Sequence, residues 1–294
     1  MDIVITYVNG LDPEWQANYA RHAGGGLLNK RYRDWGTLPF LFRGIEKCMP
    51  FVNKVFLIVA RESQVPEWID RSSVNVVLHE DFIPSRFLPT FNSTAIEMFM
   101  HKIQGLGEEF IYFNDDFFPL LPCKPTDFFR QGRIAVSMAR HLLTFKDMFR
   151  KQVKNSDRLA RRAAGVGCGL LYVRPQHTCA PMLRSASQEL YRKCESEILA
   201  SVSSLRKRFN YNQYLYTDYM YFSGLSFPKR ISNVHLSLSV ATAGQLRKAI
   251  VSPRHKIACI NDVEMSNEKF ERLCKVIHDA FSVRFPEKSK YERC

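Results

Sequence analysis

The sequence predicts an α/β protein built on a doubly wound, mainly parallel sheet. β-branched and aromatic runs of strand length alternate with segments whose apolar residues recur at helical spacing. Turn-forming residues such as Asn9-Gly10 and Asn114-Asp115 close the runs. With 294 residues, 46% of them hydrophobic and 13% aromatic, the chain is long enough to fill a substantial core. This alternation of strand and helix is typical of sheets covered by helices on both faces.

Each element follows from a local pattern. The segment DIVITYV is a strand closed by a turn, and LPFLFRGI is a helix that Pro50 stops. Asn92 or Ser93 offers an N-cap for the helix NSTAIEMFMHKI, and FIYF reads as a buried strand. Strands are expected at 2–8, 54–60, 74–83, 110–113 and 255–262, and helices at 38–45, 92–103, 145–165 and 185–209.

The expected organisation is a single domain over residues 1–294. Its core is residues 1–130 and 165–294, and a basic helical insertion occupies about 140–165, where the composition shifts to FKDMFRKQVKNSDRLARRAAG. No internal repeat or low-complexity linker divides the sequence.

The charge balance points to an anionic partner. Lysine and arginine number 42 against 29 acidic residues, a net charge of +13. The eight cysteines show neither a disulfide framework nor zinc-finger spacing. No apolar run approaches the roughly 18 residues that cross a bilayer, and Asp2 follows Met1 directly. A cytoplasmic location is expected, with peripheral contact at the inner membrane face as a further expectation.

Paired polar residues follow two of the expected strands. Asn114, Asp115 and Asp116 come after FIYF, and Asn261 and Asp262 end the last strand. Such residues often make surface turns. They also collect at the sheet edge where open α/β sheets bind ligands, and adjacent carboxylates are stabilised by a divalent cation. A metal site and a pair of plain turns are both open on this pattern.

Five blocks of the chain resemble, in order, the conserved regions of the Stealth family. This family contains the hexose-1-phosphate transferases of bacterial capsule synthesis, and its animal relative is the N-acetylglucosamine-1-phosphotransferase that marks lysosomal enzymes. The resemblance spans Asp2 to Glu292. The blocks are DIVITYVNGLDPEW, RYRDWGTLPFLFRGIEKCMPFVNKVFLIV, LHEDFIPSRFLPTFNSTAIEMFMHKIQGLGEEFIYFNDD, HTCAPMLRSASQEL and IACINDVEMSNEKFERLCKVIHDAF with FPEKSKYE.

The resemblance implies an enzyme with a nucleotide-sugar-transferase-like fold, of GT-A or Rossmann-like type. The implied reaction moves a hexose- or N-acetylhexosamine-1-phosphate from a UDP-sugar such as UDP-GlcNAc to a hydroxyl of a glycan acceptor. It releases UMP and leaves a phosphodiester in a cell-surface or capsular polysaccharide. The implied cofactor is Mg²⁺ or Mn²⁺, which suits phosphoryl transfer.

The resemblance also implies site residues. Arg206 would clamp the donor phosphate, because a guanidinium binds two oxygens at once. His177 would take the proton of the acceptor hydroxyl, with a structural role or a phosphate contact as the alternatives. The metal ligands implied are Asp115, Asp116 and Asp262, with Asp116 also orienting the donor as a catalytic residue. The residues expected to bind the nucleotide-sugar are Asp2, Asn9, Arg33, Asp34, Asn92, Ser93 and Asn261.

Several positions leave alternatives open. Asp2 and Asn9 also fit a strand cap and turn, and Arg33 and Asp34 a salt-bridged helix start. Three residues depart from the family's pattern: Cys179 replaces a proline, Asn210 an acid and Val263 a second carboxylate.

Two other functions compete with the phosphotransferase. One is a metal-dependent glycosyltransferase that releases UDP, and the other is a basic, non-enzymatic binding domain. No nucleic-acid partner is expected, because the aromatic residues do not alternate with basic ones as in stacking surfaces.

Overall fold

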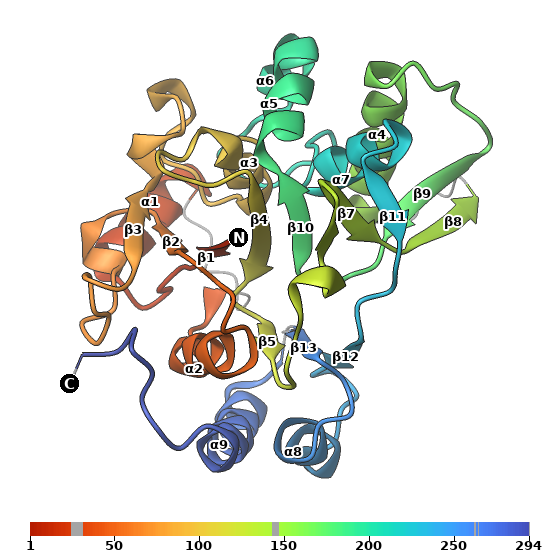
Figure 1. Ribbon diagram of the computed structural model, residues 1–294. Coiled ribbons are helices and arrows are strands. Elements are labelled where there is room, and N and C mark those ends of the chain that lie inside the picture. The colour runs from red at the N-terminus through yellow and green to blue at the C-terminus, as the bar shows by residue number, and fades with distance from the viewer. Residues whose placement is uncertain (25–31, 143–146, 262, 264, 294) are drawn as a thin grey trace. The chain divides into compact units, whose positions relative to one another are not determined.

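The computed structural model describes residues 1–24, 32–142, 147–261, 263 and 265–293 (Figure 1). The described chain forms two compact units, each assembled from separate segments. One consists of Met1–Asp2, Val77–Tyr112 and Pro125–Arg230, and the other of Ile3–Val76, Phe113–Lys124 and Ile231–Cys294. They are called the central unit and the terminal unit below.

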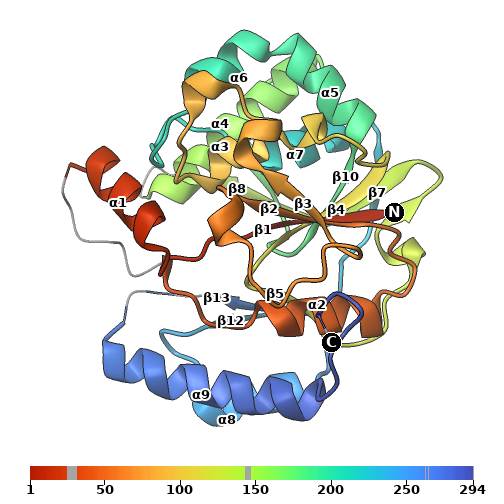
Figure 2. The same ribbon diagram turned by 90° about the vertical axis from the view of Figure 1, so that its left-hand side faces the viewer.

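The terminal unit combines parallel strand pairs with long helices. Strand β1 pairs in parallel with β2, and β12 pairs in parallel with β13, which pairs antiparallel with β5. Helices α8 and α9 lie side by side along the β12–β13–β5 sheet (Figure 2). Its elements are β1 (Asp2–Thr6), α1 (Pro13–His22), α2 (Leu38–Cys48), β2 (Val55–Val59), η2 (Glu62–Gln64), β3 (Asn75–Leu78), β5 (Phe117–Pro119), β12 (Asn233–Ser237), α8 (Ala243–Val251), β13 (Ile257–Asn261) and α9 (Asn267–Arg284).

The central unit packs helices around short, mostly antiparallel strand pairs. Strand β4 pairs with β10, β6 with β7 and β8 with β9, all antiparallel, while β7 pairs in parallel with β11. Its elements are η3 (His79–Asp81), η4 (Ser85–Phe87), α3 (Ser93–Glu97), η5 (Met100–Lys102), β4 (Glu109–Asn114), η6 (Pro125–Asp127), β6 (Phe129–Arg130), β7 (Arg133–Val136), β8 (Met138–Leu142), α4 (Met148–Ala163), β9 (Leu171–Pro175), β10 (Ala180–Leu183), α5 (Arg184–Lys193), α6 (Glu195–Ser201), α7 (Tyr214–Phe222) and β11 (Ser226–Pro228).

The predicted α/β class is confirmed, and its sheets are mixed. The strands predicted from continuous apolar runs are confirmed. All five residues of β2 are buried, as are Phe110 to Phe113 in β4. The helix expected from residue 38 is α2, whose apolar spacing buries Leu41, Phe42 and Ile45. Within the described residues, no helix is both long and apolar enough to span a bilayer, and no cysteine forms a disulfide.

Two predicted helices are shorter than expected. The helix from residue 93 ends at Glu97, because the hydroxyl of Tyr216 donates a 2.6 Å hydrogen bond to the Met98 carbonyl oxygen that a longer helix would use. The single helix expected over 185–209 is broken at Cys194 into α5 and α6, and α6 ends at Ser201, whose carbonyl oxygen accepts a hydrogen bond from the Asn210 side chain. In both cases tertiary contacts override helical spacing. The predicted strand over 74–83 likewise ends at Leu78 and continues as a 3₁₀ turn.

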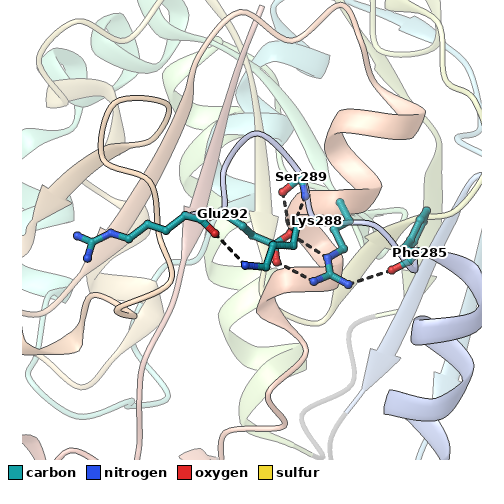
Figure 3. A network of polar contacts seen from close by, with 6 residues as sticks. Phe285, Lys288, Ser289 and Glu292 are labelled. Carbon is teal, nitrogen blue, oxygen red and sulfur yellow. Dashed lines mark hydrogen bonds and ion pairs between the residues drawn. The ribbon is translucent and has the colours of Figure 1, made fainter.

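An ion pair holds the last residues of the chain in the terminal unit (Figure 3). Arg43 on α2 donates two hydrogen bonds to the Glu292 carboxylate, at 2.8 and 2.7 Å, and a third to the Phe285 carbonyl oxygen. The Ser289 backbone N–H and hydroxyl also donate to Glu292. The Glu292 side chain is only 5% exposed, so this buried carboxylate has four donors to offset its desolvation.

Candidate active site

In the terminal unit, the two predicted polar strand ends meet. The Ile260 backbone N–H donates a 2.9 Å hydrogen bond to the Asp116 carbonyl oxygen, and Cys259 pairs with Phe117 across β13 and β5. The Cys259 thiol lies 3.5 Å from Asp116 Oδ2 and donates to it. Asn261 is therefore one residue from the backbone contact that joins the two strand ends. The expected convergence of these motifs is present among the described residues; Asp262 lies outside them.

Asp34 belongs to the same neighbourhood. The Tyr7 hydroxyl donates a 2.8 Å hydrogen bond to Asp34 Oδ2, and the Gly36 N–H donates to Oδ1 at 2.7 Å. Burial and the adjacent Asp34 charge raise the Tyr7 pKa well above its ordinary value, and the Asp115 charge raises it further. The Tyr7 ring thus lies near both predicted acidic residues. Tyr7 was missed in the sequence, although its place just after the first strand is where ligand contacts collect.

The oxygen atoms gathered here fit a hard divalent cation. Asp115 is exposed and Asp116 and Asn261 are partly buried, so carboxylate and amide oxygens lie at or near the surface. Mg²⁺ and Mn²⁺ prefer such oxygen ligands. Asp115 and Asp116 are the residues that would hold the ion, with Asn261 beside them.

Arg33 is directed toward the last conserved block. Its guanidinium donates a hydrogen bond to the Asn267 side chain and lies 4.9 Å from the centre of the Phe270 ring. Both partners belong to α9. In these contacts Arg33 binds α9, whereas Asp34 accepts from Tyr7 and Gly36. This differs from a salt bridge between the two residues at a helix start.

Asp2 and Asn9 lie at opposite ends of β1. Asp2 begins the strand, is buried, and accepts a 2.8 Å hydrogen bond from the Gly107 N–H. Asn9 follows the strand and accepts from the Leu11 N–H at 2.9 Å, which is an Asx turn. These contacts match the strand-cap and turn alternatives, and the structure does not bring the two side chains together.

In the central unit, three predicted residues come together at the N-terminus of α3. Asn92 caps the helix by accepting from the Thr94 N–H at 3.1 Å. The Arg206 guanidinium donates a 2.6 Å hydrogen bond to the Ser93 hydroxyl oxygen. Arg206 lies on the loop after α6, so this contact joins residues that are far apart in the sequence.

Asn210 fixes the loop that carries Arg206. It is 1% exposed, and its side-chain oxygen accepts from the Lys207 N–H at 2.6 Å and from the Asn92 side chain at 3.1 Å. Its side-chain amide donates to the Ser201 carbonyl oxygen and to the Ser203 hydroxyl. An aspartate would keep the acceptor and lose both donated bonds. Asparagine therefore suits this loop better than the acid of the family's pattern.

Glu97 is the principal residue that the sequence did not identify. It is buried, accepts a 2.6 Å hydrogen bond from the Gln213 N–H, and lies close enough to Arg206 to feel its charge. Burial raises its pKa to about 7, against the lowering effects of Arg206, the Gln213 N–H, Ser93 and Tyr112. A carboxyl group poised near neutral pH beside a guanidinium is typical of functional sites. The only signal in the sequence was its place one turn after Ser93.

In the same unit, His177 contacts the first residue of α7, Tyr214. Its Nδ1 is 3.2 Å from the Tyr214 hydroxyl, and Tyr214 follows Gln213, whose N–H binds Glu97. The ring is partly buried, whereas the neighbouring Cys179 is fully buried. Cys179 precedes β10 and therefore fills core space in place of the family's proline.

Comparisons with known proteins identify the family to which the chain is similar. The family model for Stealth protein CR2, conserved region 2, matches residues 31–137. The receptor polysaccharide phosphotransferase WefC of Streptococcus oralis is 30% identical over 99% of this chain and 99% of its own. The capsular polysaccharide phosphotransferase WcwK of Streptococcus pneumoniae is 29% identical over 100% and 99%. A solved structure of the galactosyltransferase LgtC with donor and acceptor sugar analogs covers 95% of this chain and 96% of its own, at 11% identity and a TM-score of 0.42.

Proposed function

The chain belongs to the Stealth family of capsular polysaccharide phosphotransferases, and we propose that it transfers a sugar 1-phosphate from a UDP-sugar to a hydroxyl of a glycan acceptor. The acceptor oxygen attacks the β-phosphorus of the donor. A new phosphorus–oxygen bond forms, and the bond from that phosphorus to the oxygen bridging the two phosphates breaks. UMP leaves with the bridging oxygen, and the glycan keeps a phosphodiester.

The contact between Arg206 and Ser93 is the observation that best supports this reaction. A guanidinium positioned by a hydroxyl, with the Glu97 carboxyl nearby, has the planar N–H geometry that suits phosphate oxygens. Such donors stabilise the negative charge that spreads over the transferring phosphoryl group. Glu97 is a positioning residue in this account, because it acts on substrate through Arg206.

His177 is proposed as the base for the acceptor hydroxyl. An imidazole can accept a proton near neutral pH, and the Tyr214 hydroxyl lies 3.2 Å from Nδ1, so Nε2 is proposed as the atom that takes the proton of the acceptor. After the transfer, the His177 imidazolium releases this proton to solvent.

The acidic residues of the terminal unit are proposed to bind the metal and the nucleotide. Asp115 and Asp116 would hold Mg²⁺ or Mn²⁺, which when bound supplies positive charge to the departing UMP. Asn261, Asp34 and Arg33 are proposed to contact the donor. Asp262 keeps its predicted role as a third metal ligand.

The donor is proposed to be an N-acetylhexosamine or hexose derivative of UDP, such as UDP-GlcNAc, and the site of action the cytoplasm. Helix α4 is proposed to touch an acidic membrane face, and its Arg158 is exposed. Arg161 is not suited to this role, because it pairs with the buried Asp157. Arg158→Glu should weaken sedimentation with phosphatidylserine vesicles, and unchanged sedimentation would contradict the membrane contact.

The released nucleotide tests the reaction. The protein is incubated with UDP-sugars, Mg²⁺ and short glycan acceptors, and the nucleotides are separated by chromatography. UMP is the expected product. UDP would identify the competing glycosyltransferase, in which the bond at the anomeric carbon breaks.

A further inference from the structure

A groove of about 390 Å³ lies in the terminal unit. It is lined by β12, by one side of α8 and by the segment that follows α8, and is called the β12–α8 groove below. Its apolar side chains include Val234, Leu236, Val240 and Ala249. The side chain of Val240 is 79% exposed, so the groove presents apolar surface to solvent.

The charged side chains of the β12–α8 groove are all basic. Lys248 and Arg254 line it and are exposed, with His255 beside them, and no acidic residue is among the lining residues. Across the described ranges of the chain, no carboxylate is ion-paired with Lys248 or Arg254. Their positive charge is therefore available to an anionic ligand.

The β12–α8 groove adjoins the polar strand ends within the same sheet. Ser237 lines the groove and is the register partner of Asn261 on β13. Strand β13 in turn pairs with β5, which begins directly after Asp116. A ligand lying along β12 thus reaches the strand that ends beside the proposed metal ligands.

We propose that the β12–α8 groove binds the acceptor as an anionic glycan that already contains phosphodiesters. The inference rests on the proposed function, because each transfer would add one phosphodiester to the growing chain. Carbon–hydrogen faces of sugars would pack on Val234, Leu236 and Ala249, while Lys248 and Arg254 would bind the phosphodiester oxygens. The groove would let the enzyme hold the product of earlier transfers during the next one.

A nucleotide fits the β12–α8 groove less well. No tyrosine, phenylalanine or tryptophan is among its lining residues, so it offers no such ring for a uracil to stack on. Four consecutive residues of β12 line it, from Val234 to Ser237, and this stretch of roughly 13 Å suits an extended chain.

The test measures binding separately from catalysis. A phosphodiester-linked oligohexose and a neutral oligohexose of equal length are titrated by isothermal calorimetry into the full chain. Binding of the charged oligosaccharide should weaken roughly 10-fold or more in Lys248→Glu and in Arg254→Glu, since a charge-assisted hydrogen bond is lost and a repulsion gained. Arg254→Lys should retain much of the affinity, and Lys275→Glu, on the exposed face of α9, should behave as wild type.

The outcomes separate this inference from the proposed function. Equal binding of the two oligosaccharides, unchanged binding in both reversal variants, or displacement of the oligosaccharide by UDP would overturn the groove assignment. UMP release with a monosaccharide acceptor should be unaffected in these variants. If no acceptor yields UMP while the reversal variants still lose the charged oligosaccharide, the proposed reaction fails and the groove stands as an anionic-glycan site.

Discussion

The Arg206 guanidinium donates a 2.6 Å hydrogen bond to the Ser93 hydroxyl, and the buried Glu97 lies one helical turn after that serine. Three elements hold this arrangement. The loop after α6 carries Arg206, helix α3 carries Ser93 and Glu97, and the start of α7 donates a backbone N–H to Glu97. A positive group is thereby placed on a rigid support, which is what electrostatic stabilisation of phosphoryl transfer requires.

The raised pKa of Glu97 predicts a pH dependence of stability. Its pKa is about 7 in the folded protein and near 4.5 when unperturbed. Between these values the folded protein holds a proton that the unfolded chain has lost, so the free energy of unfolding should fall as pH rises from about 4.5 to about 7. Glu97→Gln should flatten that slope in urea unfolding measured across this range. Exposed Glu80→Gln is the control, and an unchanged slope in the Glu97 variant would refute the assignment.

Asp115→Asn and Asp116→Asn should each lower turnover by at least 10²-fold with little change in melting temperature, because a metal ligand is lost without a change of shape. UMP release at several Mg²⁺ concentrations measures the effect. Asp279→Asn, which alters an exposed pair with Lys275, is the matched control. Near-normal turnover in both test variants would favour a plain turn at this site.

His177→Gln should reduce transfer roughly 10²- to 10⁴-fold and flatten the acidic limb of the pH–rate profile. Affinity for the UDP-sugar should change little. Tyr214→Phe, which removes the hydroxyl at Nδ1, should give a smaller loss and keep the acidic limb. A loss of donor affinity with an unaltered profile would make His177 a phosphate ligand.

Breaking the Arg43–Glu292 pair should destabilise the protein. Glu292→Gln leaves the partly buried Arg43 guanidinium, whose side chain is 17% exposed, without its charged partner, and breaking a buried pair costs up to about 3 to 5 kcal/mol. Although burial acts to raise it, the Glu292 pKa is lowered overall by Arg43 and Ser289, so this stabilisation should be present above about pH 4.5 and be lost as pH falls through the lowered pKa. Thermal unfolding at pH 7 and pH 3 measures both effects. A loss no larger than that of the exposed Asp279→Asn would contradict the structural role.

The sequence predicted the elements and contacts that local patterns determine. Buried strands such as β2 and the convergence of Asp116 with Asn261 follow from apolar runs and from polar residues at strand ends. Glu97 could not be predicted in the same way. Its burial and raised pKa arise from Arg206 and Gln213, which only the folded chain brings to α3.

The departures from the family's pattern also needed the structure to be understood. Asn210 is explained by four hydrogen bonds that no local pattern reveals, and Cys179 by its burial before β10. The loop carrying Arg206 looked helical because its charged and apolar spacing is compatible with a helix. The Asn210 amide ends that helix at Ser201 instead.

The proposed reaction moves the β-phosphate of the donor to the glycan. It is tested most directly with a UDP-sugar labelled with ³²P at the β-phosphate, incubated with the protein, Mg²⁺ and an unlabelled oligosaccharide acceptor. The label should appear in the glycan and resist alkaline phosphatase, as a phosphodiester does. Label that remains entirely in UDP while the acceptor gains an unlabelled sugar would contradict it.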